Sequence, residues 1–142
     1  MSRLPANEPT PKSRALVVCD DRLIAAVVGQ LLVALDHAPV SVGTGTEAVR
    51  TLTTRTFDLI VVRYEGRPMN GLALYDFLHE SKAYRPIPFV LMVKSDMRAR
   101  LTASRSQLPV MIAPPFGQIA LQRAIARAKD PSLPDEGDIF EI

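Results

Sequence analysis

Charged and sulfur-bearing side chains stand directly after three apolar segments of this 142-residue chain. Cys19, Asp20 and Asp21 follow the first segment, Arg63 the second and Lys94 the third. If the segments are strands of an open α/β sheet, these residues lie at the carboxyl edge, where ligands bind and chemistry takes place. The acids are the oxygen ligands that Mg²⁺ prefers, and the thiol is reactive if its pKa is low. Arg63 is the unexpected member, since a guanidinium stays protonated and offers no nucleophilic oxygen.

The composition excludes several other kinds of site. A single cysteine permits neither an internal disulfide nor a cysteine-based zinc site, and the two histidines, His37 and His79, have no spacing that favours a metal centre. Tryptophan is absent and aromatic residues make up 6% of the chain, which is poor material for stacking nucleic-acid bases. Mg²⁺ at the acids would face two fixed cations, Arg63 and Lys94, which would repel it. We therefore expect no metal and no cofactor.

Strands and helices are predicted to alternate along the chain. The apolar segments lack the in/out alternation of a half-exposed strand, which indicates strands buried on both faces of a parallel sheet. Five such units favour an α/β, flavodoxin-like, doubly wound fold: a five-stranded parallel sheet in the order 2-1-3-4-5 with helices on both faces. The predicted strands span 14–20, the start of 38–46, 58–62, 87–93 and 109–113. The predicted helices span 22–35, 47–53 (with Thr46 as its cap), 71–80, 97–107 and 118–129.

Three parts of the chain differ in composition. Residues 1–13 contain Pro5, Pro9 and Pro11 and little apolar material, which predicts a flexible leader. Residues 14–129 form the predicted domain, and residues 130–142 form an acidic tail. The tail carries five acids and no base, so the net charge of +2 leaves +7 on the first 129 residues.

The N-terminal segment has no apolar core of a signal peptide, and the longest apolar run, 23–35, is too short to cross a bilayer. We expect a cytoplasmic protein.

Several segments, in this order, resemble the receiver domain of bacterial response regulators (the CheY-like family). The resemblance covers about residues 14–129 and rests on "ALVVCDDRLI", "FDLIVVRYEGRPMNGLALYDFL", "IPFVLMVKSD" and "PVMIAPPFGQIAL". It implies phosphoryl transfer from a histidine kinase to an aspartate that ends the third strand. That reaction also needs Mg²⁺, two acids after the first strand, a hydroxyl after the fourth and a lysine after the fifth.

This chain departs from the family pattern at most of those positions. The acceptor aspartate falls on Arg63, and the two acids fall on Cys19 and Asp20, with Asp21 next. The hydroxyl falls on Lys94, the lysine on Pro114, and the aromatic residue that reports activation on Met111. The matching residues are those of the scaffold, such as "MNG" at 69–71. The resemblance also implies a cis peptide between Pro114 and Pro115.

Arg63 has two interpretations. It pairs with Asp20 or Asp21 as a counter-charge in place of the metal, or it faces solvent without a partner. In partly buried surroundings, removal of one partner of such a pair would cost ~3–5 kcal/mol. Lys94 is either a second cation that joins this ion pair or a solvated side chain. Cys19 is either a redox-sensitive thiol activated by Arg63 or, as we favour, a buried inert cysteine.

A basic surface is predicted on the fourth and fifth helices. In receivers the fourth helix, fifth strand and fifth helix form the surface that meets partners, and here it would include Arg98, Arg100, Arg105, Met111, Arg123 and Arg127. Arg98 and Arg105 are seven residues apart and would share one helix face. The alternative is a solvated basic face. In the tail, Ile139, Phe140 and Ile142 would dock on the domain, bind a partner or fray.

These observations lead to one expected function and two alternatives. We expect a stand-alone pseudo-receiver: a non-enzymatic, non-phosphorylatable adaptor that binds proteins in bacterial two-component-type signalling. The first alternative is an effector that binds a cyclic dinucleotide, such as c-di-GMP, through the arginines of the fourth and fifth helices. The second is residual phosphotransfer to Asp21 or Glu65. Nucleic-acid binding is the least supported, because the net charge is low and no reading helix is evident.

Overall fold

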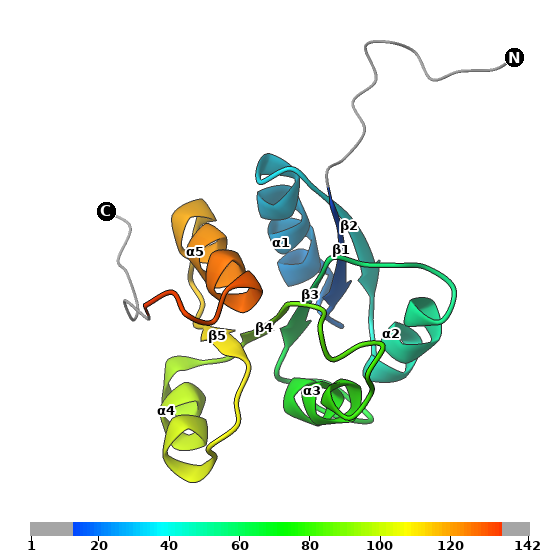
Figure 1. The fold of residues 1–142 in the computed structure, drawn as a ribbon. Helices are drawn as coiled ribbons and strands as arrows, with labels where there is room; N and C mark the ends of the chain where they lie inside the picture. Colours follow the sequence, from blue (N-terminus) through cyan, green and yellow to red (C-terminus); the bar gives the residue numbers. More distant parts are fainter. Residues whose placement is uncertain (1–12, 135–142) are drawn as a thin grey trace, which may run out of the picture.

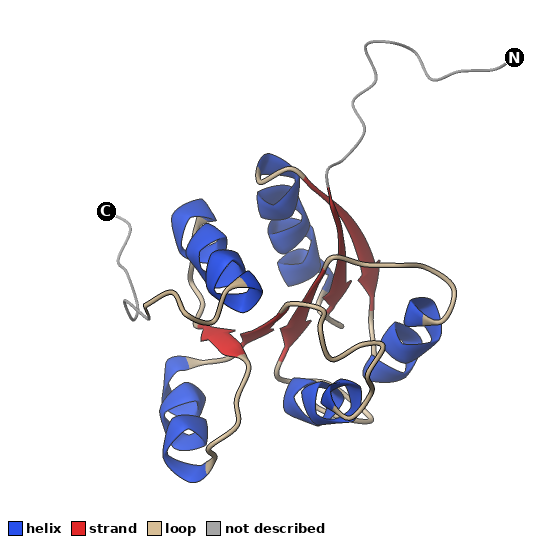
Figure 2. Ribbon diagram, viewed as in Figure 1, coloured by secondary structure: helices blue, strands red, loops and turns tan. Residues whose placement is uncertain are grey.

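The structure, a computed structural model, describes residues 13–134. Five strands and five helices alternate along this part of the chain (Figures 1 and 2). The strands are β1 (Ser13–Val18), β2 (His37–Val42), β3 (Leu59–Arg63), β4 (Phe89–Met92) and β5 (Val110–Ile112). The helices are α1 (Arg22–Ala34), α2 (Gly45–Leu52), α3 (Gly71–His79), α4 (Ser95–Ser104) and α5 (Gln118–Lys129).

The strands form one parallel sheet in the order β2-β1-β3-β4-β5, which confirms the predicted doubly wound fold. β1 pairs with β3 in a register that places Val18 beside Val62. The residues that follow these two strands therefore meet at the carboxyl edge of the sheet.

The hydrophobic core has two halves because alternate strand residues point to opposite faces. In β1, Ala15 and Val17 pack in the half covered by α1 and α5, whereas Leu16 and Val18 pack in the half covered by α2, α3 and α4. Figure 1 shows the same division, with α1 and α5 on one side of the sheet and α2, α3 and α4 on the other. Every residue of β4 is buried, as expected for a strand covered on both faces.

Two element boundaries correct the sequence prediction. The cap of α2 is Thr44, not Thr46: the Thr44 hydroxyl accepts from the Glu47 N–H (3.1 Å), while the Glu47 carboxylate accepts from the Gly43 N–H (3.2 Å). This reciprocal pair starts the helix two residues before the predicted start. α4 spans Ser95–Ser104 instead of 97–107, and Arg105 has an extended backbone (φ −136°, ψ 142°).

The terminal segments are described only in part. β1 begins at Ser13, and α5 ends at Lys129 as predicted. The division of the chain into leader, domain and tail stays a prediction, and the tail residues Ile139, Phe140 and Ile142 lie outside the described range. Between residues 13 and 134, no helix has the length and apolar character needed to cross a membrane.

Candidate functional site

Arg63 is the last residue of β3, and its guanidinium lies against two carboxylates. Arg63 Nη1 is 3.2 Å from Asp20 Oδ1, and Arg63 Nε is 3.5 Å from Glu65 Oε1. The predicted pairing of Arg63 with an acid that follows β1 is therefore present. The side chain of Arg63 is only 25% exposed, so the alternative of an unpartnered arginine facing solvent is wrong.

Asp21 has a different task from its neighbour. Its carboxylate accepts hydrogen bonds from the N–H groups of Leu23 and Ile24, both at 3.0 Å, and so caps the first turn of α1. Asp20 has no such role in the helix, and it is the acid that meets Arg63. Of the two adjacent acids, Asp21 therefore caps α1 and Asp20 forms the ion pair with Arg63.

The Arg63 ion pairs are close to solvent. The Asp20 side chain is 52% exposed and that of Glu65 is 41% exposed. The sequence predicted a partly buried ion pair, in which removal of one partner would cost ~3–5 kcal/mol. That prediction is wrong, because both carboxylates are substantially exposed. Half-exposed pairs of this kind contribute roughly 0.2–1 kcal/mol, because water already solvates the charges.

Met69 is one of the residues that line a small hollow beside Arg63. The hollow there has a volume of about 10 Å³, room for no more than one water molecule. A Cβ on Gly45 would lie 2.9 Å from Met69 Cγ, so the glycine lets the methionine enter. On the other side, a Cβ on Gly71 would lie 2.7 Å from the Arg63 carbonyl oxygen. The loop and the end of β3 therefore pack together closely.

Cys19 is the thiol at this edge, and it is only 7% exposed. Burial is the largest influence and raises the pKa of the Cys19 thiol, while a backbone hydrogen bond with Asp21 and the charge of Arg63 lower it by less. The thiol donates to the Asp21 carbonyl at 3.3 Å. Burial thus outweighs the charge of Arg63, and this favours the interpretation of Cys19 as a buried, unreactive cysteine.

Lys94 and Pro114 do not take part in the ion pairs of Arg63 with Asp20 and Glu65. Lys94 is the exposed N-cap residue of α4 and forms no ion pair with any residue of the described range, which favours the solvated interpretation over a second cation in the ion pair. Pro114 lies in the loop after β5, and the peptide between Pro114 and Pro115 is cis as predicted. Neither residue lines the hollow beside Arg63.

The predicted basic surface loses one of its members. Arg105 donates to Asp76 of α3 through two bonds, Nη2–Oδ1 at 2.7 Å and Nη1–Oδ2 at 3.0 Å. The prediction that it shares a face with Arg98 is wrong, because α4 ends at Ser104 and the extended backbone of Arg105 turns its side chain to α3.

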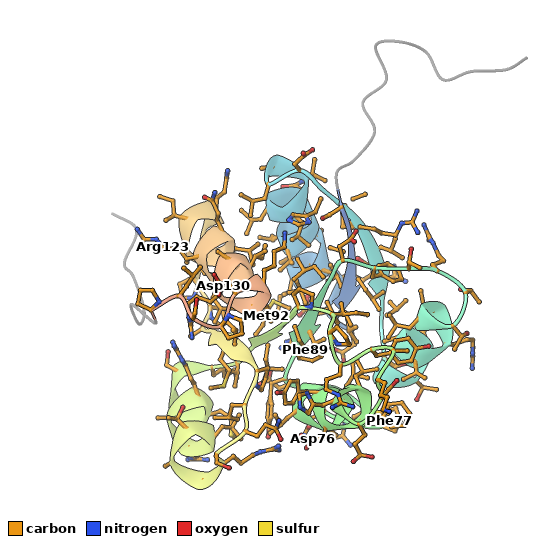
Figure 3. All side chains as sticks on the ribbon, in the orientation of Figure 1. Asp76, Phe77, Phe89, Met92, Arg123 and Asp130 are labelled. Carbon is orange, nitrogen blue, oxygen red and sulfur yellow. The ribbon has the colours of Figure 1, made fainter. Side chains whose placement is uncertain are left out.

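The other members of the surface lie on several elements. Met111, in β5, packs partly buried against the core half that holds α4. Arg98 and Arg100 lie on α4, and Arg123 and Arg127 lie on α5. In Figure 3, Arg123 points outward from α5, while Asp76 lies on α3, which covers the other face of the sheet.

The sequence did not predict the contacts of three residues: Glu65, Met69 and Asp76. The sequence predicts Glu65 only as an alternative phosphoryl acceptor and not as a partner of Arg63. Residues two apart in an extended chain nevertheless place their side chains on the same side. The sequence predicts Met69 only as part of the scaffold, and no local pattern marks it as a residue that lines the hollow beside Arg63. Asp76 and Arg105 are 29 positions apart, and only the tertiary fold joins them.

No family model matches the chain, and no curated protein matches its sequence. Its structure is similar to many solved structures. A sensor protein from Polaromonas sp. JS666 has a TM-score of 0.76 at 20% identity, covering 85% of this chain and 98% of that one. The receiver domain of a signal transduction histidine kinase from Syntrophus aciditrophicus has a TM-score of 0.74 at 24% identity, covering 92% and 98%.

A third neighbour is the receiver domain of a sensor histidine kinase from Pseudomonas aeruginosa PAO1, which holds a magnesium ion in its active-site cleft. It has a TM-score of 0.71 at 19% identity and covers 82% of this chain and 97% of that one. The chain thus has the fold of these receiver domains.

Proposed function

We propose that this chain is a pseudo-receiver: a non-enzymatic module that is not phosphorylated and that binds other proteins as an adaptor in two-component-type signalling. The observation that carries the proposal is the position of Arg63. Its guanidinium occupies the end of β3 and contacts the two nearest carboxylates, Asp20 at 3.2 Å and Glu65 at 3.5 Å. Arginine cannot form an acyl phosphate, so the strand end offers no acceptor.

The side chains around Arg63 do not fit Mg²⁺, the ion that one structural neighbour holds in its cleft. Mg²⁺ prefers hard oxygen ligands from one or more carboxylates. Asp20 and Glu65 already face a fixed cation, and Asp21 accepts two backbone hydrogen bonds. Within residues 13–134, no group of three or more His, Cys, Asp or Glu side chains is placed to hold a metal ion.

Partner binding is proposed for the surface of α4, β5 and α5. Arg100 is exposed there, and the first 129 residues carry a charge of +7, which favours a partner with an acidic surface. The ion pair of Arg105 with Asp76 removes one of the arginines on which cyclic-dinucleotide binding would depend. Protein binding is therefore the better-supported function.

A Mg²⁺ titration tests the first half of the proposal. We expect the amide resonances of residues 19–21 and 63–65 in the full chain to stay unchanged in millimolar Mg²⁺. Arg63→Asp replaces the cation with a carboxylate and is expected to acquire Mg²⁺-dependent shifts at these amides. Arg100→Asp makes the same charge change on α4, at a residue that does not line the hollow beside Arg63, and serves as the control. Saturable shifts in the wild-type chain would overturn the proposal.

The adaptor role is tested by capture of partners from native extract. Capture is expected to be the same with and without acetyl phosphate and to fall for the double variant Arg98→Glu/Arg100→Glu. A partner that binds only in the presence of acetyl phosphate would contradict a phosphorylation-independent adaptor.

A further inference from the structure

An uncharged stripe runs along the outer face of α1. It consists of Leu23, Ala26, Val27, Gln30, Val33 and Ala34, and all six are exposed. Leu23 is 75% exposed, Val27 49% and Val33 61%, whereas Val28 and Leu32 on the opposite side are buried. The outer face of a helix in a globular domain is usually charged or polar. We call these six residues the α1 stripe.

The spacing of the α1 stripe is that of a helix–helix seam. Positions 23, 26, 30 and 33 alternate by three and four, with Val27 and Ala34 adding one neighbour in each turn. This is the pattern by which two helices pack side by side, and a polar residue such as Gln30 within a seam fixes the register. The α1 stripe is therefore suited to packing against another helix rather than to exposure to solvent.

The charges at the ends of α1 indicate which helix that is. Arg22 is the first residue of α1 and Asp36 follows its last turn, and both are exposed. Each lies seven positions from residue 29. A second α1 laid antiparallel about a twofold axis near this point would bring Arg22 of each copy opposite Asp36 of the other. Asp21, at the same end, already accepts two backbone hydrogen bonds.

The side-chain sizes agree with the same arrangement. In the antiparallel pairing the large Leu23 at one end comes near the small Ala34 at the other end of the second copy. Large and small side chains that alternate across a seam interdigitate without leaving voids. One surface thus complements itself in both shape and charge.

We propose that two copies of this chain associate through their α1 stripes as an antiparallel, twofold-symmetric dimer. A helix of 13 residues is only ~20 Å long, so the contact is smaller than a standard interface of ~1,600 Å². The dimer is accordingly weak and forms at high concentration. It leaves the Arg63 ion pairs untouched, and it holds whether or not the chain is phosphorylated.

Sedimentation equilibrium of the full chain, from ~1 μM to ~1 mM, tests the proposal. A monomer–dimer equilibrium is expected in the wild type. Leu23→Glu is expected to raise the dimer Kd at least about tenfold, because the carboxylate would be desolvated in the seam. Phe77→Glu is the matched control: Phe77 is 53% exposed on α3, away from the stripe, and the Kd should not change.

Three results would overturn the α1 dimer. A wild-type chain that stays monomeric throughout the range excludes self-association and leaves the stripe to a helix of another protein. A trimer or open polymer contradicts the twofold arrangement. A dimer that Phe77→Glu disrupts and Leu23→Glu does not is formed by another surface.

The antiparallel register is tested by exchanging its charges. Arg22→Glu and Asp36→Lys are each expected to dimerise more weakly than the wild type, because each homodimer places like charges together twice. In a heterodimer of the two variants, the two substituted side chains carry opposite charges and meet at one end, while the unchanged Arg22 and Asp36 meet at the other. The Kd of an equimolar mixture should therefore return toward the wild-type value. Circular dichroism checks that both variants fold, and a mixture no tighter than the single variants would refute the antiparallel register.

Discussion

The strength of the Arg63–Asp20 pair can be predicted from its geometry and measured by a double-mutant cycle. At 3.2 Å the Coulomb attraction of two unit charges in bulk water is roughly 1.3 kcal/mol. Ordering two exposed side chains offsets part of this, and Asp20 is 52% exposed. We therefore expect a coupling energy of about 0.3–1 kcal/mol between Arg63→Ala and Asp20→Ala.

The cycle is read from urea unfolding of the wild type, both single variants and the double variant. The coupling should shrink in ~1 M salt, where the Debye length falls to ~3 Å. A parallel cycle of Lys94→Ala with Asp20→Ala should give no coupling, because Lys94 forms no ion pair within residues 13–134.

Two results would refute this reasoning. A coupling of ~3 kcal/mol or more that salt does not reduce would mean that the pair is a buried joint. Zero coupling at low salt would mean that Arg63 and Asp20 do not interact in solution.

Three further predictions concern packing and titration. Gly71→Ala should lower the free energy of unfolding by roughly 1–3 kcal/mol, because its Cβ would lie 2.7 Å from both the Arg63 oxygen and Leu91 Cδ1. Gly29→Ala, whose Cβ would lie 3.8 Å from the nearest Pro39 atom, should instead raise it by about 0.5–1 kcal/mol; similar thermal melts for the two variants would contradict the packing at Gly71. Cys19 should react with a disulfide reagent at pH ~8 more slowly than in the unfolded chain, since burial raises the pKa of its thiol; equal rates would mean an accessible thiolate. Burial, and secondarily the charge of Lys129, lowers the pKa of His37 below its ordinary 6.5, so the unfolded chain binds the proton more readily and stability is lost as the pH falls below about 6.5. Urea midpoints between pH ~7 and ~5 should fall in the wild type and fall less in His37→Phe, and equal slopes would exclude His37 as the source.

The fold was predictable from the sequence because its signals are local and repeated. Five apolar segments without alternation can be buried only in a sheet covered on both faces, and the helices between them force parallel strands. The exact ends of the helices were harder to predict from the sequence. Thr44 and Thr46 both lie near the start of α2, and only the reciprocal contact with Glu47 distinguishes them.

The candidate site was predictable in part. The parallel register brings the ends of β1 and β3 together, so a charge after one strand meets a charge after the other. The sequence could not show how exposed that meeting point is, because exposure depends on loops such as the one that carries Met69. It also could not show that Arg105 turns to Asp76, since α4 ends one residue earlier.

The most direct test is whether the residues around Arg63, at the carboxyl edge of the sheet, accept a phosphoryl group. It is made by measuring the intact mass of the full chain after incubation with acetyl phosphate and Mg²⁺. We expect the mass to remain that of the unmodified protein, because the side chain at the end of β3 cannot accept a phosphoryl group. A stable increase by the mass of HPO₃, located by peptide mapping on Asp20, Asp21 or Glu65, would contradict the proposal that this chain is a pseudo-receiver.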